Sequence, residues 1–259
     1  MQSANLTLYA EGSSWLHSRH PFSKLSYIVL IGVAAYCAPI GVGPKAALLA
    51  FNVMLAAWSG ILCQVWSLSW RILLPLALFM FPIHGLFFPD NQTAIFSFQG
   101  ITLYAEGLQF AGTILLQLTT VLSASLLFVF TTHPADFISA LSQAGWPPFA
   151  SYLMGSPLLM LPAMRARTAT IQAAQRARGL DSEGGIMRRI RSLPPLVAPL
   201  VLGAFSEIEH RAIALELRGF SARGPKTSLR EVPDSRLQRT IRRLMLAVSL
   251  GLVAYALAT

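Results

Sequence analysis

Two arginine–glycine pairs are the residues of this sequence best suited to chemistry at a protein surface. Ala177-Arg178-Gly179-Leu180 and Leu217-Arg218-Gly219-Phe220 share the form apolar, Arg, Gly, apolar and recur after 40 residues. A guanidinium group presents five N–H donors in a planar fork, which suits carboxylate and carbonyl groups of a partner. Taken singly, each pair is also explained as a helix cap, with the glycine ending the helix and the arginine offsetting its dipole. The recurrence favours two docking tips, with Leu180 and Phe220 as apolar anchors.

Other chemistry-bearing residues form no recognisable active site. No zinc-type spacing, Cys-x-x-Cys, His-Glu-x-x-His or phosphate-binding glycine loop is present, so we expect no metal and no ATP to be bound by this chain. His84 is the only ionisable group well inside an apolar run, and we interpret it as a helix-break histidine bonded to a freed carbonyl rather than as a ligand. Three glutamates lie among Arg211 and Arg218 and are interpreted as ion pairs along a helix: Glu207, Glu209 and Glu216.

The elements that position these residues belong to a membrane protein. The chain has 259 residues, 54% of them apolar and only 12% charged, whereas soluble domains carry about 25% charged residues. Its mean hydropathy is +0.56. This composition excludes a disordered chain, and two cysteines exclude a disulfide scaffold. Cys37 and Cys63 both lie in apolar runs, where we expect buried thiols in lipid or helix contacts.

Five apolar runs predict five membrane spans, at roughly 25–40, 46–65, 72–89, 108–130 and 244–258. Sixteen of the 20 Lys and Arg residues lie between His133 and Arg243, in a segment flanked by such runs. The positive-inside rule therefore places this segment in the cytoplasm, and the four preceding spans place the N-terminus there too. The same rule explains the net charge of +9 better than nucleic-acid binding does.

The sequence thus predicts an all-α integral membrane protein of three parts: a four-span bundle over 1–130, a cytoplasmic region over 131–240 and a last span over 241–259. Within the cytoplasmic region, a short helix is expected from Pro134 to Ala144. Two apolar runs with internal prolines, 149–163 and 193–205, are interpreted as helices lying against the membrane face or the bundle, with membrane crossing left open.

Two longer helices are expected to start after Pro162 and Pro199 and to end at the two glycines. Each carries a row of small or apolar residues at helical spacing, and such rows allow another helix to approach closely. The row of the first helix is Ala163, Ala166, Thr170, Ala173 and Ala177, and that of the second is Ala204, Ile208, Ala212, Leu215 and Gly219. We expect the two helices to cross along these rows.

Together these features resemble the transmembrane T component of energy-coupling factor (ECF) transporters, the family of cobalt, nickel and vitamin-uptake membrane subunits. SSWLHSRHPFSKL (13–25) resembles the family's Leu-His-x-x-x-Pro-x-x-Lys pattern before the first span, and LFFPD with GITLYAEGL (86–108) resembles its outer loop. TTHPADFISALSQAGWP (131–147) resembles the start of its coupling region, and the two Arg-Gly tips resemble its paired Ala-Arg-Gly signatures. Leu217 stands where the family often has alanine, a departure that affects local packing only.

The resemblance implies a non-catalytic scaffold in a bacterial or archaeal cytoplasmic membrane. Two crossing coupling helices would insert the tips with Arg178 and Arg218 into grooves of two ABC-type ATPase subunits, which bind ATP and magnesium. A small membrane S component would bind the substrate, a vitamin or a transition-metal ion.

Two other classes of function remain open at this stage. An intramembrane enzyme of the lipid-modifying type would need convergent acids and histidines, and the sequence offers only His84 with Asp90 and Glu106 at the outer edge. A self-contained permease would need several polar groups within its spans. The candidates are ordinary helix-packing residues at this density: Asn52, Gln117, Ser123 and Ser125.

Overall fold

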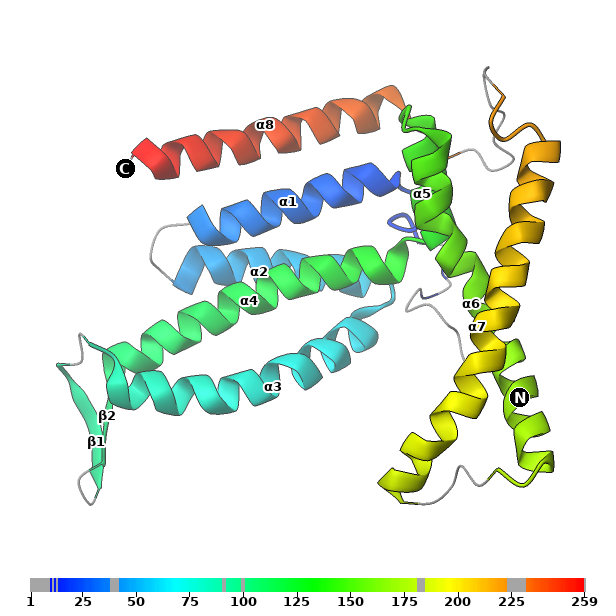
Figure 1. Cartoon of the computed structure of the whole chain (residues 1–259). Coiled ribbons are helices and arrows are strands. Elements are labelled where there is room, and N and C mark those ends of the chain that lie inside the picture. The colour runs from blue at the N-terminus through cyan, green and yellow to red at the C-terminus, as the bar shows by residue number, and fades with distance from the viewer. Residues whose placement is uncertain are drawn as a thin grey trace. The chain divides into compact units, whose positions relative to one another are not determined.

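The computed structural model describes residues 10, 12, 14–37, 42–89, 92–98, 101–180, 185–222 and 232–258. This part of the chain forms eight helices and one two-stranded sheet (Figure 1). The elements are α1 (Pro21–Cys37), α2 (Val42–Trp58), α3 (Leu62–Phe87), β1 (Ala94–Phe98), β2 (Ile101–Tyr104), α4 (Ala105–Thr131), α5 (Pro134–Gln143), α6 (Pro148–Ala177), α7 (Ile186–Leu217) and α8 (Arg236–Ala258). The expected all-α membrane class is confirmed.

The chain divides into two compact units. The first unit, here called the bundle, comprises residues 7–140 and 232–259, and the second is built mainly from residues 141–231, with α6 and α7 as its long helices. In the bundle α4 packs against α1, α2 and α3, while α8 packs on α1. Apolar side chains from α2, α3, α4 and the turn between α2 and α3 form its core cluster: Ala56, Ile61, Val65, Leu126, Leu127 and Phe130.

Each of the five predicted spans corresponds to an apolar helix of the bundle. α3, α4 and α8 are long and apolar enough to cross a membrane, and α1 and α2 are apolar helices of 17 residues each. One predicted boundary is wrong, because the run at 46–65 is divided between α2 and α3. Gly60, with φ of +73°, ends α2 after Trp58, since glycine adopts this left-handed conformation without a Cβ clash.

Prolines inside α6 and α7 do not end either helix. The runs at 149–163 and 193–205 are therefore not separate short helices, as predicted, but parts of α6 and α7. The predicted helix starts after Pro162 and Pro199 are wrong for the same reason. A proline within a helix removes one backbone donor and bends the axis, while the hydrogen bonds on either side continue.

Two shorter elements complete the description. β1 and β2 pair in antiparallel fashion between α3 and α4, a hairpin that the pattern of apolar runs does not predict. Glu106, in the first turn of α4, accepts hydrogen bonds from the backbone N–H of Thr93 at 3.0 Å and from its hydroxyl, and so ties the hairpin to that helix. The predicted helix at 134–144 is confirmed as α5, with the Ala135 N–H donating to Nδ1 of His133 at 3.1 Å.

Candidate functional site

The end of α6 is fixed by a pair of backbone hydrogen bonds around Arg178. The Gly179 N–H donates to the carbonyl of Arg176 at 2.9 Å, and the Leu180 N–H donates to the carbonyl of Gln175 at 3.0 Å. Gly179 has φ of +88°. This is the Schellman arrangement, in which glycine reverses the chain and satisfies carbonyls that the helix leaves unpaired. Arg178 is consequently the last residue before the chain turns away.

The end of α7 repeats this geometry. The Gly219 N–H donates to the carbonyl of Glu216 at 2.9 Å, the Phe220 N–H donates to that of Leu215 at 2.9 Å, and φ of Gly219 is +73°. Arg218 therefore holds the same position on α7 that Arg178 holds on α6. The backbone dihedrals of the two arginines agree, with φ and ψ of −85° and 5° for Arg178 and −84° and 4° for Arg218.

Two other helices of the described chain end in the same cap without an arginine. At α2 the Gly60 N–H donates to the Ala57 carbonyl at 3.1 Å, and the residue before the glycine is Ser59. At α5 the Gly145 N–H donates to the Ser142 carbonyl at 3.2 Å. The cap itself does not require arginine, so the capping explanation accounts for the two glycines but not for the arginines.

The side chains at both tips face outward. Arg178 and Arg218 are exposed, and Leu217 beside the second tip is 84% exposed. Leu180 is half-buried, and Phe220 packs edge-on against Tyr152 near the start of α6, with 5.4 Å between ring centroids. Ala177 is exposed like its neighbouring arginine. Each tip thus presents a guanidinium fork beside apolar surface.

α6 and α7 run antiparallel and pass across each other (Figure 1). Their contacts lie at three levels: Tyr152 meets Phe220, Arg167 meets Glu207 at 3.0 Å, and the Gln175 side-chain amide donates to the Pro195 carbonyl at 3.1 Å. Because residue numbers rise on one helix as they fall on the other, the two arginine tips lie at opposite ends of the pair.

The small-residue rows expected at the crossing are placed mainly on exposed faces. On α6, all five residues of the row are exposed: Ala163, Ala166, Thr170, Ala173 and Ala177. On α7, Ala204 and Leu215 are half-buried, whereas Ile208 and Ala212 are exposed. The contact instead uses the longer side chains of Arg167 and Gln175 on α6, and Gly203 of α7 lies under the Arg167 guanidinium.

Glu207 is the centre of the polar contact between the two helices. It pairs with Arg167 at 3.0 Å and with Arg211, one turn along α7, at 2.6 Å. The hydrogen bond from Arg211, with the two positive charges nearby, lowers the pKa of the Glu207 carboxyl. The predicted ion pairing along the helix is confirmed for Glu207, while Glu209 and Glu216 are exposed.

The remaining candidate residues are engaged in packing. Nδ1 of His84 lies 3.0 Å from the carbonyl of Met80, one turn earlier in α3, and its ring packs against Phe110. Cys37 and Cys63 are free thiols, the first half-buried and the second exposed on α3. Asp90 lies outside the described residues. Within the described ranges, no three His, Cys, Asp or Glu side chains gather as a metal site would require.

Polar side chains within the apolar helices bond to one another. Asn52 is 1% exposed, accepts from the Tyr27 hydroxyl and donates to the Thr120 carbonyl at 2.9 Å and to Oγ of Ser123 at 3.0 Å. Lys45 Nζ of α2 likewise donates to Gln117 Oε1 of α4 at 3.1 Å, whereas Ser125 Oγ donates within α4 to the Val121 carbonyl at 2.9 Å. Asn52, Gln117 and Ser123 thus take part in helix packing, as predicted, and the Ser125 bond stays within one helix.

A network that links the segment before α1, Lys24 in α1 and the end of α4 gives a structural reason for the Leu-His-x-x-x-Pro-x-x-Lys pattern. The buried Lys24 ammonium donates to the carbonyl of Thr131, at the C-terminus of α4, at 2.7 Å. Nε2 of His17 donates to the Ala10 carbonyl at 3.0 Å, so its Nδ1 accepts from the Ser14 hydroxyl at 2.6 Å. Burial, reinforced by the nearby Lys24 charge, lowers the pKa of His17 despite this backbone bond. Sequence reasoning did not anticipate these contacts, and the bond from Lys24 to Thr131 joins residues 107 positions apart.

Comparison with known proteins agrees with this architecture. The family model described as CbiQ, cobalt transport protein, matches residues 12–229. The energy-coupling factor transporter transmembrane protein EcfT of Brevibacillus brevis is 30% identical over 241 residues, covering 90% of each chain. The EcfT protein of Exiguobacterium sibiricum is 30% identical over 256 residues, covering 93% of this chain and 94% of its own. That of Lactococcus lactis is 27% identical over 247 residues, covering 90% of each.

The matched region contains α1 to α7 and both arginine tips, and the relatives align over nearly the full length. Five apolar helices, the α6–α7 pair and these matches lead to one assignment. The chain is membrane-embedded and belongs to the CbiQ cobalt transport protein family, the transmembrane T components of energy-coupling factor transporters.

Proposed function

We propose that this chain is the coupling subunit of an ECF importer. In this role it transmits an ATP-driven conformational change from two ABC-type ATPase subunits to a small membrane S component, which binds a vitamin or transition-metal ion as substrate. The chain itself is non-catalytic, and ATP and magnesium are bound by the ATPases. The single observation that carries the proposal is the matched pair of exposed arginines, each fixed at a helix tip by the same cap.

The geometry suits a mechanical contact. A Schellman cap holds the arginine backbone rigidly at the last turn, so displacement of the guanidinium displaces the whole helix. Carboxylates and carbonyl groups at the edge of an ATPase groove would accept from the planar fork of Arg178 or Arg218. Leu180 and Phe220, with Ala177, Gly179, Leu217 and Gly219 beside the arginines, would supply the apolar and close-approach surface of each tip.

Exposed apolar side chains of α6 and α7 are suited to contact the membrane side of the complex. Large apolar side chains are exposed along both helices in the two proline-containing runs: Phe149, Leu153, Met154, Leu193, Val201, Leu202 and Phe205. These would contact lipid or the S component. With the arginine-rich segment in the cytoplasm, the N-terminus is cytoplasmic too, in the cytoplasmic membrane of a bacterium or archaeon.

The decisive experiment removes both guanidinium groups. We expect Arg178→Ala with Arg218→Ala to leave membrane insertion unchanged and to reduce transport-coupled ATP hydrolysis to background, because each tip loses charge-assisted hydrogen bonds to its ATPase. A matched control, Arg165→Ala with Arg236→Ala, removes two exposed arginines away from the tips and should retain coupling. Coupled hydrolysis at the wild-type rate in the tip variant would refute the docking role.

A further inference from the structure

One side chain ties the last turn of α6 to α7. Nε2 of Gln175 donates to the carbonyl of Pro195 at 3.1 Å. Because a carbonyl oxygen only accepts hydrogen bonds, the atom that faces it must be the nitrogen of the side-chain amide. Gln175 is half-buried, whereas Arg176 and Ala177, which follow it, are exposed. Gln175 therefore links to α7 the end of α6 that carries Arg178.

The acceptor of this bond is available because of a proline one turn further along α7. In an α-helix the carbonyl of one residue accepts from the N–H four residues later, and for Pro195 that later residue is Pro199. Proline has no N–H, and its ring crowds the same carbonyl. The Pro195 carbonyl thus lacks its usual partner in α7. Since an unpaired carbonyl away from water costs free energy, a donor from α6 stabilises the pair of helices.

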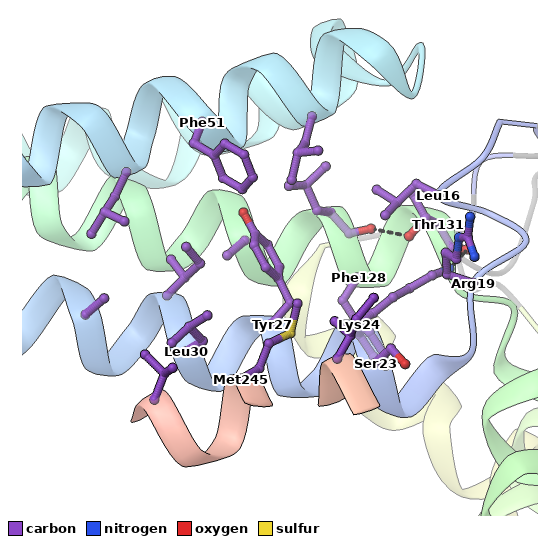
Figure 2. A pocket seen from close by; sticks show the side chains of 18 of the residues that line it. Leu16, Arg19, Ser23, Lys24, Tyr27, Leu30, Phe51, Phe128, Thr131 and Met245 are labelled. Atoms are coloured by element: carbon purple, nitrogen blue, oxygen red, sulfur yellow. Dashed lines mark hydrogen bonds between the residues drawn. The ribbon is translucent and has the colours of Figure 1, made fainter. Parts of the chain in front are cut away.

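The bundle contains a second carbonyl of this kind. Thr131 is the last residue of α4, where the carbonyls have no N–H of their own helix to accept from. The Lys24 ammonium of α1 donates to this carbonyl at 2.7 Å, and both residues are labelled in Figure 2. In each unit, a side chain of one helix bonds to a carbonyl that another helix leaves free. Such a bond fixes the donor at one defined level of the acceptor's helix.

Gln175 also takes part in the cap that positions Arg178. Its carbonyl accepts from the Leu180 N–H at 3.0 Å and from the Arg178 N–H at 3.1 Å. The backbone of Gln175 therefore closes the last turn of α6, while its side chain holds that turn against α7. A displacement of α7 at Pro195 reaches the turn that carries the guanidinium through this one residue.

We infer that Gln175 is a positioning residue for the Arg178 tip, and that Pro199 serves this role by freeing the carbonyl to which Gln175 bonds. Gln175 sets the direction in which the last turn of α6 projects from α7 and needs no contact of its own with a partner protein. The second tip is held differently, through Phe220 and Tyr152. The inference rests on the proposed function, in which Arg178 docks on an ATPase subunit.

Double electron–electron resonance tests the link itself, independently of coupling. Both cysteines of the full chain are replaced by serine, and spin labels are attached at Ala174 of α6 and Glu209 of α7, which are exposed. Gln175→Glu has the same size but no N–H at neutral pH, so the single narrow distance of the wild type should be lost to a broad distribution. The matched control, Gln172→Glu, adds the same charge at an exposed position of α6 and should leave the distance narrow. A narrow, unshifted distance in Gln175→Glu would overturn the inference.

Coupled ATP hydrolysis by the reconstituted complex tests whether this position matters for function. Gln175→Glu should lower it about fivefold, the equilibrium factor of one typical hydrogen bond. Gln175→Lys restores an N–H donor at similar reach and should recover coupling, while Gln172→Glu should match the wild type. Wild-type coupling in Gln175→Glu, with coupling lost in the double variant of Arg178 and Arg218, would refute the positioning role alone. Wild-type coupling in that double variant would refute the proposed function instead.

A double-mutant cycle tests the part played by Pro199. Pro199→Ala supplies an N–H that can bond to the Pro195 carbonyl within α7, so Gln175→Glu should lower coupling less in this background than in the wild type. The matched control is Pro194→Ala, which restores a donor to the carbonyl of Ile190 and should leave the effect of Gln175→Glu unchanged. Equal effects of Gln175→Glu with and without Pro199 would contradict the inference.

Discussion

The helix ends at Gly60 in the bundle and at Gly179 in the α6–α7 unit are built by the same backbone hydrogen bonds but carry different side chains. Before Gly60 stands Ser59, whose hydroxyl donates back to the Leu55 carbonyl of its own helix at 2.8 Å. Before Gly179 stands Arg178, exposed at the tip. The bundle uses its polar groups for internal packing, whereas the α6–α7 unit leaves the arginine at this helix end exposed. If the exposed arginine docks on a partner as proposed, stability and function are separable between the two units.

Transplanting the bundle cap onto α6 gives the largest expected effect. Arg178→Ser reproduces the Ser59-Gly60 sequence at the tip and retains the cap, so the unfolding temperature should be unchanged. Loss of charge-assisted hydrogen bonds should lower coupled transport by about tenfold or more. Arg178→Lys keeps the charge without the planar fork, so its coupled transport should lie between those of the wild type and the serine variant. Transport assays in proteoliposomes measure both variants. Full transport by the serine variant would show that the arginine before Gly179 has no more functional importance than the serine before Gly60.

Breaking the hydrogen-bond network around Asn52 in the bundle should have the opposite effect, because it should lower stability rather than coupled transport. Asn52→Leu keeps the branched shape and the number of side-chain heavy atoms but leaves the Tyr27 hydroxyl without its acceptor and removes the donor to Ser123, so we expect a loss of about 2 kcal/mol in the free energy of unfolding. Ser125→Ala, which removes a bond within one helix, is the control and should cost well under 1 kcal/mol. Thermal unfolding in detergent compares the two; equal shifts would show that the Asn52 bonds do not hold the helices together.

Straining one cap tests whether rigidity of the tip matters. Gly179→Ala forces a Cβ into a left-handed residue with φ of +88°, at a cost of about 1 kcal/mol. The end of α6 should fray, which hydrogen exchange at residues 175–180 would detect, and coupling should decline with it. Gly32→Ala, inside α1 with no atom within 4 Å of the new Cβ, should instead be neutral or slightly stabilising. Unchanged exchange at the α6 tip would contradict the expected fraying.

The smallest effect is a pH dependence confined to the bundle. The pKa of His17 is lowered in the folded chain, chiefly by burial, so below the ordinary value of 6.5 the unfolded chain takes up a proton that the folded chain resists. The contribution of His17 to stability should therefore be fully present above about pH 6.5 and decline as the pH falls below that value. The His17→Gln variant should show a shallower decline in thermal unfolding between pH 7.5 and 5.5, whereas His210→Gln, on exposed α7, should match wild type.

The features predictable from sequence are those encoded locally. The Arg-Gly tips, α5 and the five apolar helices follow from composition and cap residues within a few positions. Ser59-Gly60 is a dipeptide typical of a turn, but it lies inside a continuous apolar run, whose hydropathy predicts one span over 46–65. The helix starts predicted after Pro162 and Pro199 are wrong because each proline removes only one backbone donor. The remaining hydrogen bonds of α6 and α7 outweigh that loss.

Long-range contacts were beyond sequence reasoning. The α6–α7 contact is made by Arg167, Glu207 and Gln175, while the spacing of the small residues predicts a contact along another face. Likewise the bond from Lys24 to Thr131 links residues 107 positions apart. Neither can be inferred from local spacing, because a flexible polar side chain can bond to a partner in several directions.

Two antiparallel helices with the same terminal motif are related by an approximate two-fold axis perpendicular to the pair. Twenty-five residues separate Tyr152, beside one tip, from Ala177 at the other, which corresponds to about 38 Å along α6. A partner that engages both tips must offer two equivalent grooves with matching separation and the same symmetry, as a dimer does. The two tips differ in their apolar residues, which are Ala177 and Leu180 at one tip and Leu217 and Phe220 at the other. A partner made of two different subunits would therefore bind the α6–α7 pair in a preferred orientation.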